Sequence, residues 1–245
     1  MLELKYRERI YGGYVTARRT ILAPITVEGL KPRAAYLNRL IEQHFPRNLQ
    51  CTVLEIGCGH GALIYFAQLK GYLRIEGVDG SAEQVDAAKR LGVKTVRHGD
   101  LMTTLATVSD ASLDMVVAFD VIEHFNRNEL IELVDAVYRV LKPGGKWIIH
   151  VPNADSPFFG RILFGDLTHE MAFTRTSISQ LLLSSGYKKI DCFEDRPIPH
   201  TIKGFIRLVL WHGFRTVLRL YLAAETGNTA KDEIFSQNML AIALK

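Results

Sequence analysis

Residues 52–61, TVLEIGCGHG, decide the fold of this chain of 245 residues. The short apolar run Val53–Ile56 is typical of a strand buried in a parallel sheet. Glycines follow at positions 57, 59 and 61, where they let the backbone turn sharply and approach a ligand closely. A helix that begins directly after such a turn points its N–H groups at anionic or polar ligand groups. We therefore expect a strand, a ligand-binding glycine loop and a helix.

Short apolar runs and helical periodicity alternate along the rest of the chain. We expect helices over 62–70, 82–91, 128–141 and 177–185, and strands over 73–78, 93–98, 113–119, 147–151, 189–193 and 238–244. A polar loop precedes the strand at 113, and a long Gly- and Pro-rich connection covers 152–175. Strands that alternate with helices at this spacing predict an α/β fold with a parallel, doubly wound sheet.

The composition limits the class of protein. Apolar residues make up 48% of the chain and charged residues 23%, which is enough for a sizeable core and excludes wholesale disorder. The net charge of +4 hides basic flanks around an acidic centre, and it is too small to indicate a nucleic-acid partner. Three cysteines lack the spacing of a zinc site or a disulfide framework. Without a long apolar run or a signal peptide, we expect a cytoplasmic protein.

The sequence divides into two regions. Residues 1–50 are polar and basic, with a helix expected over 33–44, and we assign them to an N-terminal cap region. Residues 51–245 form the main domain, with a helical insertion at about 200–225.

Acidic residues follow the strands next to the glycine loop. Asp79 ends the second strand, where a carboxylate can accept both hydroxyls of a ribose. Glu55 precedes the loop and could receive a ligand amino group, and Asp100 ends the third strand. The glycine pattern also satisfies the loose fingerprint of nicotinamide dinucleotide enzymes, so the loop alone leaves both cofactors open.

Together these residues resemble the class I S-adenosylmethionine-dependent methyltransferases, in particular small-molecule O-methyltransferases of the quinone-biosynthesis or glycan type. The resemblance implies a Rossmann-like, seven-stranded, mostly parallel sheet with an antiparallel last strand, a helical N-terminal cap and a helical insertion before the last strand. It implies S-adenosylmethionine as cofactor and S-adenosylhomocysteine as product. It places the cofactor against Glu55, Gly57, Cys58, Gly59, Gly61, Asp79, Gly80, Asp100, Leu101, Phe119 and Asp120.

The segment after the fourth strand, Asp120-Val-Ile-Glu123-His124, carries two carboxylates and an imidazole that could converge on one helical face. It is similar to a segment of quinone-biosynthesis O-methyltransferases that has been linked to a divalent ion. The same letters occur in relatives without a metal, and we predict polar residues that contact the cofactor or cap a helix, with no metal.

Histidines are the candidates for a catalytic base. His169 lies in the connection after the fifth strand, at the edge of the sheet where ligands bind, and could accept the proton of an acceptor hydroxyl. His124 is the second candidate. His150 lies inside a strand, where we expect it to pack, and His60 should face solvent or the cofactor carboxylate. A base is needed for a hydroxyl acceptor more than for an amine, so the histidines favour oxygen.

The basic flanks are the expected acceptor side. We predict that Tyr11, Tyr14, Arg18 and Arg175 bind the acceptor. Residues 202–222 combine Lys203, Arg207, Arg215 and Arg219 with many apolar residues, and glycines at 204 and 213 favour two short helices. This stretch could be a lid, a homodimer contact or a peripheral contact with the inner membrane surface.

We therefore predict methyl transfer to a small molecule, at a hydroxyl of a sugar, a glycan, or a quinone-like or lipid-linked compound that could be anionic. The alternatives are an N-methyltransferase, a nucleic-acid-modifying methyltransferase that uses the basic flanks, and a non-catalytic partner subunit that binds the cofactor. We do not expect a nucleic-acid partner.

Overall fold

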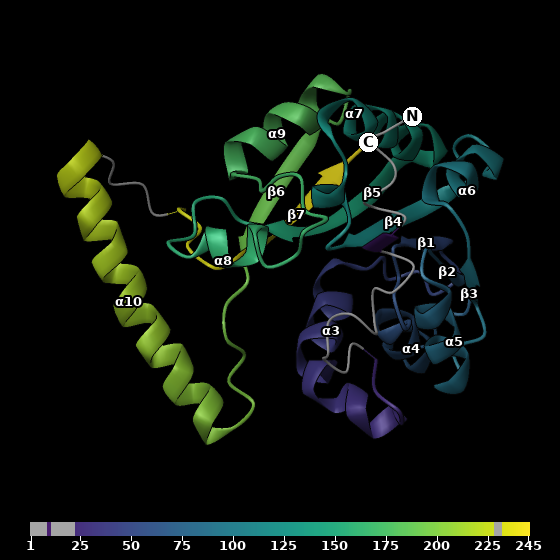
Figure 1. The fold of residues 1–245 in the computed structure, drawn as a ribbon, viewed down its shortest axis with the longest axis horizontal. Helices are drawn as coiled ribbons and strands as arrows, with labels where there is room; N and C mark the ends of the chain where they lie inside the picture. Colours follow the sequence, from purple (N-terminus) through teal and green to yellow (C-terminus); the bar gives the residue numbers. More distant parts are fainter. Residues whose placement is uncertain (1–8, 11–22, 228–231) are drawn as a thin grey trace.

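The computed structural model describes residues 9–10, 23–227 and 232–245, and within these residues seven strands form one sheet (Figure 1). The strands are β1 (Val53–Ile56), β2 (Ile75–Asp79), β3 (Val96–His98), β4 (Leu113–Phe119), β5 (Leu141–Pro152), β6 (Lys189–Glu194) and β7 (Asn238–Leu244). Their order is β3-β2-β1-β4-β5-β7-β6. The first five strands pair in parallel, and β7 runs antiparallel to both β5 and β6. The predicted fold class, including the antiparallel last strand, is confirmed.

Helices cover both faces of this sheet (Figure 1). The buried residues of α3 (Lys31–His44), α4 (Ala62–Leu69) and α5 (Ala82–Arg90) pack against one face. Those of α6 (Leu101–Thr107), α7 (Arg127–Val140) and α9 (Arg175–Ser184) pack against the other. Strand β4 shows why both cores are apolar: Met115 and Val117 enter the first core, whereas Val116 and Ala118 enter the second. Side chains of a strand alternate between faces, so a strand covered on both sides must be apolar throughout.

Shorter elements connect these layers. They are the 3-10 helices η1 (Val27–Leu30) and η2 (Ile122–His124) and the helix α8 (Phe159–Leu163), which lies in the long connection after β5. The last helix, α10 (Ile202–Thr226), stands apart from the sheet and its covering helices (Figure 1). Within the part of the chain that the structure describes, no helix combines the length and the apolar character needed to cross a membrane.

The expected elements differ from those observed in several places, and strand β5, for example, begins at Leu141 and not at 147. Two further differences concern helices. The polar loop after β3 contains α6, because Asp100 caps this helix by accepting a hydrogen bond from the Thr103 N–H at 2.7 Å. The two short helices expected over 202–222 are one continuous helix of 25 residues. Gly213 lies in its interior, where a Cβ atom would meet nothing within 4 Å, so this glycine lowers helix propensity without breaking the helix.

Candidate active site

A cavity of about 640 Å³ opens at the carboxyl ends of β1 and β4. Between these two strands the order of strands in the sheet changes direction. Strand β1 is followed by a crossover to β2 on one side, and β4 lies on its other side. Parallel α/β sheets bind ligands at this switch point. The cavity is lined by the glycine loop, by α3, by the segment after β4 and by the connection after β5.

The glycine loop owes its shape to positive φ angles at Gly57, Gly59 and Gly61, which are +64°, +54° and +72°. At Gly57 a Cβ atom would lie 2.3 Å from Cγ2 of Val121, so a side chain is excluded by space as well as by conformation. Asp79 holds the loop: its Oδ2 accepts the Gly59 N–H at 2.7 Å and its Oδ1 accepts the Ser81 N–H at 2.8 Å. Burial raises the pKa of Asp79, and these two backbone hydrogen bonds oppose that effect.

Glu55 brings an unpartnered carboxylate to the cavity. The side chain is 3% exposed, and its Oε2 has no hydrogen-bond partner among the described residues. Burial raises the pKa of Glu55 to about 8, although the charge of Arg33 on α3 acts in the opposite direction. A buried carboxylate that lacks a partner is costly, and a ligand ammonium group would supply one. The residue thus fits the amino group of a methionine-like ligand.

The predicted cofactor residues fall into two sets. Around the cavity the structure brings together Glu55, Gly57, Cys58, Gly59, Phe119 and Asp120. The other predicted residues do not line the cavity: Gly61 caps the start of α4, Asp79 ends β2 with Gly80 after it, and Asp100 and Leu101 stand at the start of α6. Their contact with the cofactor stays a prediction.

Asp120 belongs to a chain of charged groups around the buried imidazole of His150. Its backbone is left-handed at φ +54°, and its Oδ1 lies 2.7 Å from Nδ1 of His150. The other ring nitrogen of His150 lies 3.4 Å from Oδ2 of Asp195. Burial disfavours the imidazolium, but the two carboxylates outweigh it and raise the pKa of His150 to about 10. His150 does pack, stacked on Phe119 with ring centroids 4.9 Å apart, yet the expectation of a packing residue alone was incomplete.

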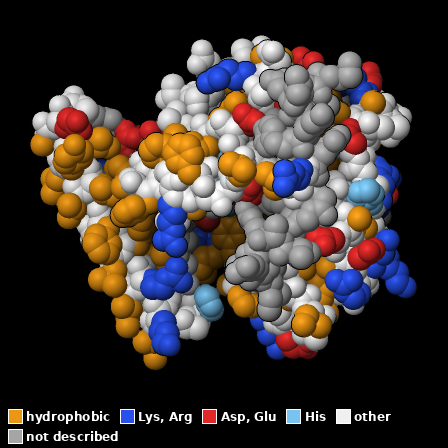
Figure 2. Space-filling model, in the orientation of Figure 1, with side chains coloured by type: hydrophobic (Ala, Val, Ile, Leu, Met, Phe, Trp, Pro, Cys, Tyr) orange, Lys and Arg blue, Asp and Glu red, His pale blue; other side chains and the backbone are white. Residues whose placement is uncertain are grey.

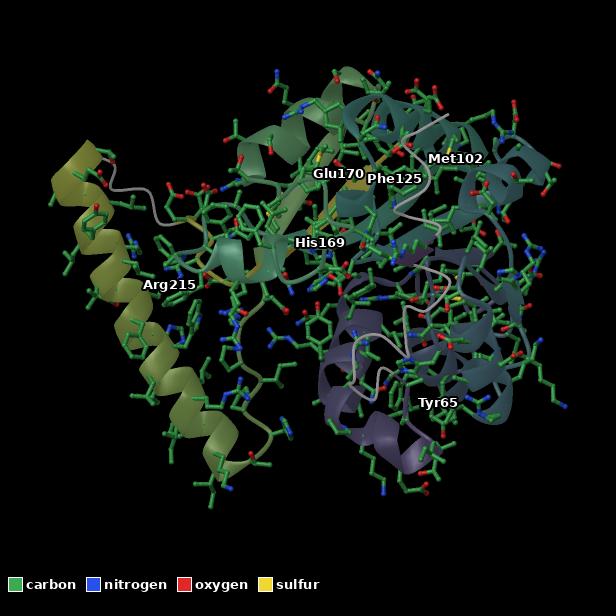
Figure 3. The ribbon with its side chains drawn as sticks, in the orientation of Figure 1. Tyr65, Met102, Phe125, His169, Glu170 and Arg215 are labelled. Atoms are coloured by element: carbon green, nitrogen blue, oxygen red, sulfur yellow. The ribbon has the colours of Figure 1, made fainter. Side chains whose placement is uncertain are left out.

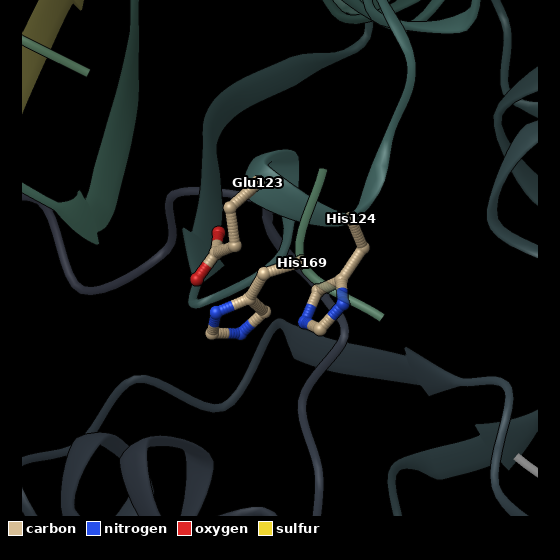
Figure 4. A group of neighbouring side chains, drawn as sticks. All are labelled: Glu123, His124 and His169. Atoms are coloured by element: carbon tan, nitrogen blue, oxygen red, sulfur yellow. The ribbon is translucent and has the colours of Figure 1, made fainter. Parts of the chain in front are cut away.

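Glu123, His124 and His169 meet at the cavity (Figure 4). One potential ligand atom from each lies within 4.8 Å of the others, and the two imidazole centroids are 4.7 Å apart. Glu123 is completely buried, and neither carboxylate oxygen has a hydrogen-bond partner among the described residues. Burial, followed by the charge of Asp120, raises the pKa of Glu123 well above its ordinary value.

Backbone carbonyls orient both imidazoles. Nδ1 of His169 lies 3.1 Å from the Ile162 carbonyl oxygen, and Nδ1 of His124 lies 3.2 Å from the Thr168 carbonyl oxygen. The Thr168 hydroxyl donates its proton to Asp166, so it too can only accept from His124. Each Nδ1 therefore carries the proton in the neutral ring, and each Nε2 keeps its lone pair. Burial, and then the neighbouring His169, lower the pKa of His124 to about 4, so this imidazole is neutral at physiological pH.

This trio can act in two ways. An imidazole with a directed lone pair can accept a proton from a hydroxyl. Two imidazoles and one carboxylate are also a donor set that suits a borderline divalent ion. The prediction of no metal is not tested by the structure, and the trio differs from the predicted set because His169 takes the place of Asp120.

Sequence reasoning missed several cavity residues. They are Arg33 and Leu37 on α3 and Arg161, Ile162 and Asp166 in the connection after β5. The Gly- and Pro-rich composition of that connection gave no sign of α8. His60, which was expected to face solvent or the cofactor carboxylate, lines the cavity. Its contact with the cofactor stays a prediction.

The predicted acceptor residues lie elsewhere or outside the described residues. Arg175, the first residue of α9, forms an ion pair with Asp232 and is absent from the cavity lining. Tyr11, Tyr14 and Arg18 fall outside the described residues. Their roles stay predictions.

A sequence model of the methyltransferase domain family (Methyltransf_23) matches residues 30–191, well over half of the chain. The chain belongs to this family. The match begins before α3 and ends in β6. It therefore includes all the described residues that line the cavity apart from Asn238 on β7. The resemblance to class I S-adenosylmethionine-dependent methyltransferases is confirmed, and S-adenosylmethionine is the cofactor.

Individual proteins resemble this methyltransferase over part of their length. The "Probable S-adenosylmethionine-dependent methyltransferase" of Mycolicibacterium smegmatis is 32% identical over 142 residues, 57% of this chain and 52% of that protein. The small RNA 2'-O-methyltransferase of Mus musculus is 27% identical over 161 residues, 59% of this chain and 39% of that protein. The chain thus spans about half or less of these curated relatives.

The fold extends further than the sequence similarity. The crystal structure of an S-adenosylmethionine-dependent methyltransferase from Archaeoglobus fulgidus aligns over 100% of both chains with a TM-score of 0.67 and 19% identity. At that identity the likeness concerns the fold alone.

Proposed function

We propose that this protein transfers the methyl group of S-adenosylmethionine to a hydroxyl of a small molecule, with His169 as the group that accepts the hydroxyl proton. The observation that carries the proposal is the pairing of two different sites in one cavity. One side offers the glycine loop and the unpartnered Glu55, and the other offers two oriented imidazoles.

The glycine-loop side supports cofactor binding. Glu55 would pair with the amino group of the methionyl part, and backbone N–H groups of the loop would approach its polar atoms. When bound, the cofactor supplies a methyl group that its sulfonium has already activated. The protein then has two tasks, which are to align the acceptor with that methyl group and to take up the acceptor proton.

The histidine side supports an oxygen acceptor. A hydroxyl must lose a proton during transfer, and Nε2 of His169 keeps the lone pair that could accept it. A neutral amine acceptor needs no such base. In an N-methyltransferase neither oriented imidazole would therefore be needed to accept a proton during transfer. The similar mouse protein is named as a 2'-O-methyltransferase, which is also transfer to a hydroxyl.

The connection after β5 supports an acceptor with an apolar part, because it exposes apolar side chains as well as lining the cavity. Phe164 and Leu167 are 80% and 79% exposed in the segment that supplies Arg161, Ile162 and Asp166 to the cavity. A quinone-like phenol or a lipid-linked sugar would combine such a part with a hydroxyl.

A second candidate role for the trio is to hold a divalent ion, which the unpartnered carboxylate of Glu123 favours. The ion would be held by Glu123, His124 and His169 and would lower the pKa of an acceptor hydroxyl. Turnover after treatment with a chelator separates the roles: a base alone keeps its activity, whereas an ion site loses it and recovers when the ion is restored.

The test of the proposal is the variant His169→Ala, with His200→Ala as a matched control because His200 is exposed and lies outside the cavity. Formation of S-adenosylhomocysteine is followed with a panel of hydroxyl and amine acceptors, and cofactor affinity is followed by calorimetry. We expect about a 10²–10⁴-fold loss of turnover in His169→Ala with unchanged cofactor affinity. Unchanged turnover would remove His169 as the base, and turnover with amines alone would overturn the hydroxyl acceptor.

A further inference from the structure

Helix α10 exposes an apolar face that nothing in the described structure covers. It has 25 residues and so extends over about 37 Å at the usual rise per residue. Figure 2 shows hydrophobic side chains along its outer edge, while Lys and Arg side chains lie on the side turned toward the hollow between the helix and the body. Its large exposed apolar residues, each between 52% and 82% exposed, are Ile202, Phe205, Ile206, Val209, Leu210, Phe214, Val217, Leu220 and Tyr221.

These nine residues, hereafter the apolar face, occupy one half of the helix circumference. At 100° per residue they fall within an arc of about 180°. The other half contains the partly covered residues Leu208, Trp211, Arg215, Leu218 and Leu222. A soluble domain seldom exposes a continuous apolar strip of this length without a partner.

Arg215 fixes which half points outward. It extends from α10 toward the body (Figure 3), where its Nε lies 3.0 Å from Oε2 of Glu194. One Nη donates to the Glu233 carbonyl oxygen at 2.7 Å, and the guanidinium lies over the Phe235 ring at 5.8 Å. A side chain held by these contacts prevents α10 from turning its apolar face onto the domain.

The charges on α10 select the partner. Lys203 and Arg207 lie at one border of the apolar face, and His212 and Arg219 lie at the other. Residues 196–223 contain five Lys or Arg residues and no Asp or Glu. An apolar strip with basic borders is the pattern of helices that lie in the surface of an anionic bilayer.

The same charges disfavour a second copy of the chain. In a two-fold dimer the apolar faces would meet each other, and the basic borders of one helix would meet those of the other. The helix has no acid before Glu225 to compensate this repulsion.

We propose that α10 lies in the surface of an anionic lipid bilayer, with its apolar face among the acyl chains and its basic borders at the headgroups. The helix then holds the methyltransferase at the lipid surface. The inference is independent of which group the enzyme methylates.

Co-sedimentation of the full chain with vesicles tests this inference. The vesicles consist of phosphatidylcholine alone or of phosphatidylcholine with phosphatidylglycerol. We expect binding to be about tenfold or more stronger with the anionic vesicles and to weaken as salt is added. Replacing Lys203 and Arg207 by Gln should remove most of this preference.

A matched pair of variants tests the apolar face. The double variant Val209→Glu with Leu220→Glu should bind anionic vesicles about tenfold or more weakly. Leu69→Glu with Leu73→Glu is the control, because it adds the same charge at two exposed leucines outside α10, 68% and 71% exposed against 66% for Leu220. The control should bind vesicles like the wild type, and all variants should keep their affinity for S-adenosylhomocysteine, which shows that they are folded.

Three results would overturn the inference. The first is no binding to either vesicle, and the second is equal binding by the double variant and the wild type. The third is a dimer in sedimentation velocity that the double variant abolishes without any vesicle binding, which would make the apolar face an interface between copies.

Discussion

The glycine-loop side of the cavity and its histidine side hold their functional groups by different means. On the first side, consecutive residues at the end of β1 form the site, and Asp79 secures them by accepting the Gly59 N–H. On the second, η2 supplies Glu123 and His124, while His169 comes from a connection about 45 residues later in the chain. The first site therefore depends on backbone geometry, and the second depends on how two distant segments pack.

This difference determines which substitutions should matter for which step. Changes to backbone conformation should remove cofactor binding, because the loop depends on three left-handed glycines and on the Gly59 N–H that Asp79 accepts. Changes to the side chains of the trio should leave the cofactor in place and affect the transfer to the acceptor.

The largest effect should come from Gly57→Ala. A Cβ atom there meets Val121 at 2.3 Å and requires a left-handed residue, so we expect a loss of about 2–4 kcal/mol of stability and no measurable cofactor binding. The free energy of unfolding in urea and calorimetry with S-adenosylhomocysteine measure the two effects.

Gly92→Ala is the matched control for that variant. Gly92 has φ +86° with nothing within 4 Å of its missing Cβ, so only the conformational cost of about 1–2 kcal/mol applies. Equal losses in the two variants, or normal cofactor binding by Gly57→Ala, would show that contact with Val121 does not shape the loop.

A smaller effect concerns the chain of charged groups behind Asp120. The pKa of His150 is raised to about 10, so the charged imidazolium stabilises the folded protein. Its contribution to the free energy of unfolding is complete below the ordinary histidine pKa and is lost as the pH rises through 10. We expect the melting temperature to fall between pH 7 and pH 10 in the wild type, and the slope to be shallower in His150→Gln. Identical slopes would mean that His150 is neutral between its two carboxylates.

The sequence allowed the cofactor side to be predicted better than the acceptor side, for a physical reason. The apolar run and the spaced glycines of residues 52–61 form a local pattern, and local patterns specify strands, turns and helix starts. The alternation of strands and helices along the chain predicted a doubly wound sheet, and the glycine-loop motif placed Glu55, Gly57 and Gly59 at the cavity.

The acceptor side depends on contacts that no local pattern contains. His124 and His169 were each candidates, but their proximity and that of Glu123 follow from the packing of the connection after β5 on η2. Arg33 was missed because nothing in α3 distinguishes it from other basic residues near the N-terminus. Helix α10 was predicted as two short helices because its two glycines lower helix propensity. The cap that Thr201 forms at its start and the contacts of Arg215 stabilise one continuous helix.

The division of the cavity into two sides is tested most directly by titrating S-adenosylmethionine into Glu55→Gln and Glu123→Gln by calorimetry. The two substitutions are isosteric, and both remove a buried carboxylate that lacks a partner among the described residues. We predict that Glu55→Gln weakens cofactor binding by about tenfold or more, because the ammonium group loses a charged partner, whereas Glu123→Gln binds like the wild type. Equal weakening by both substitutions, or normal binding by Glu55→Gln, would contradict this account.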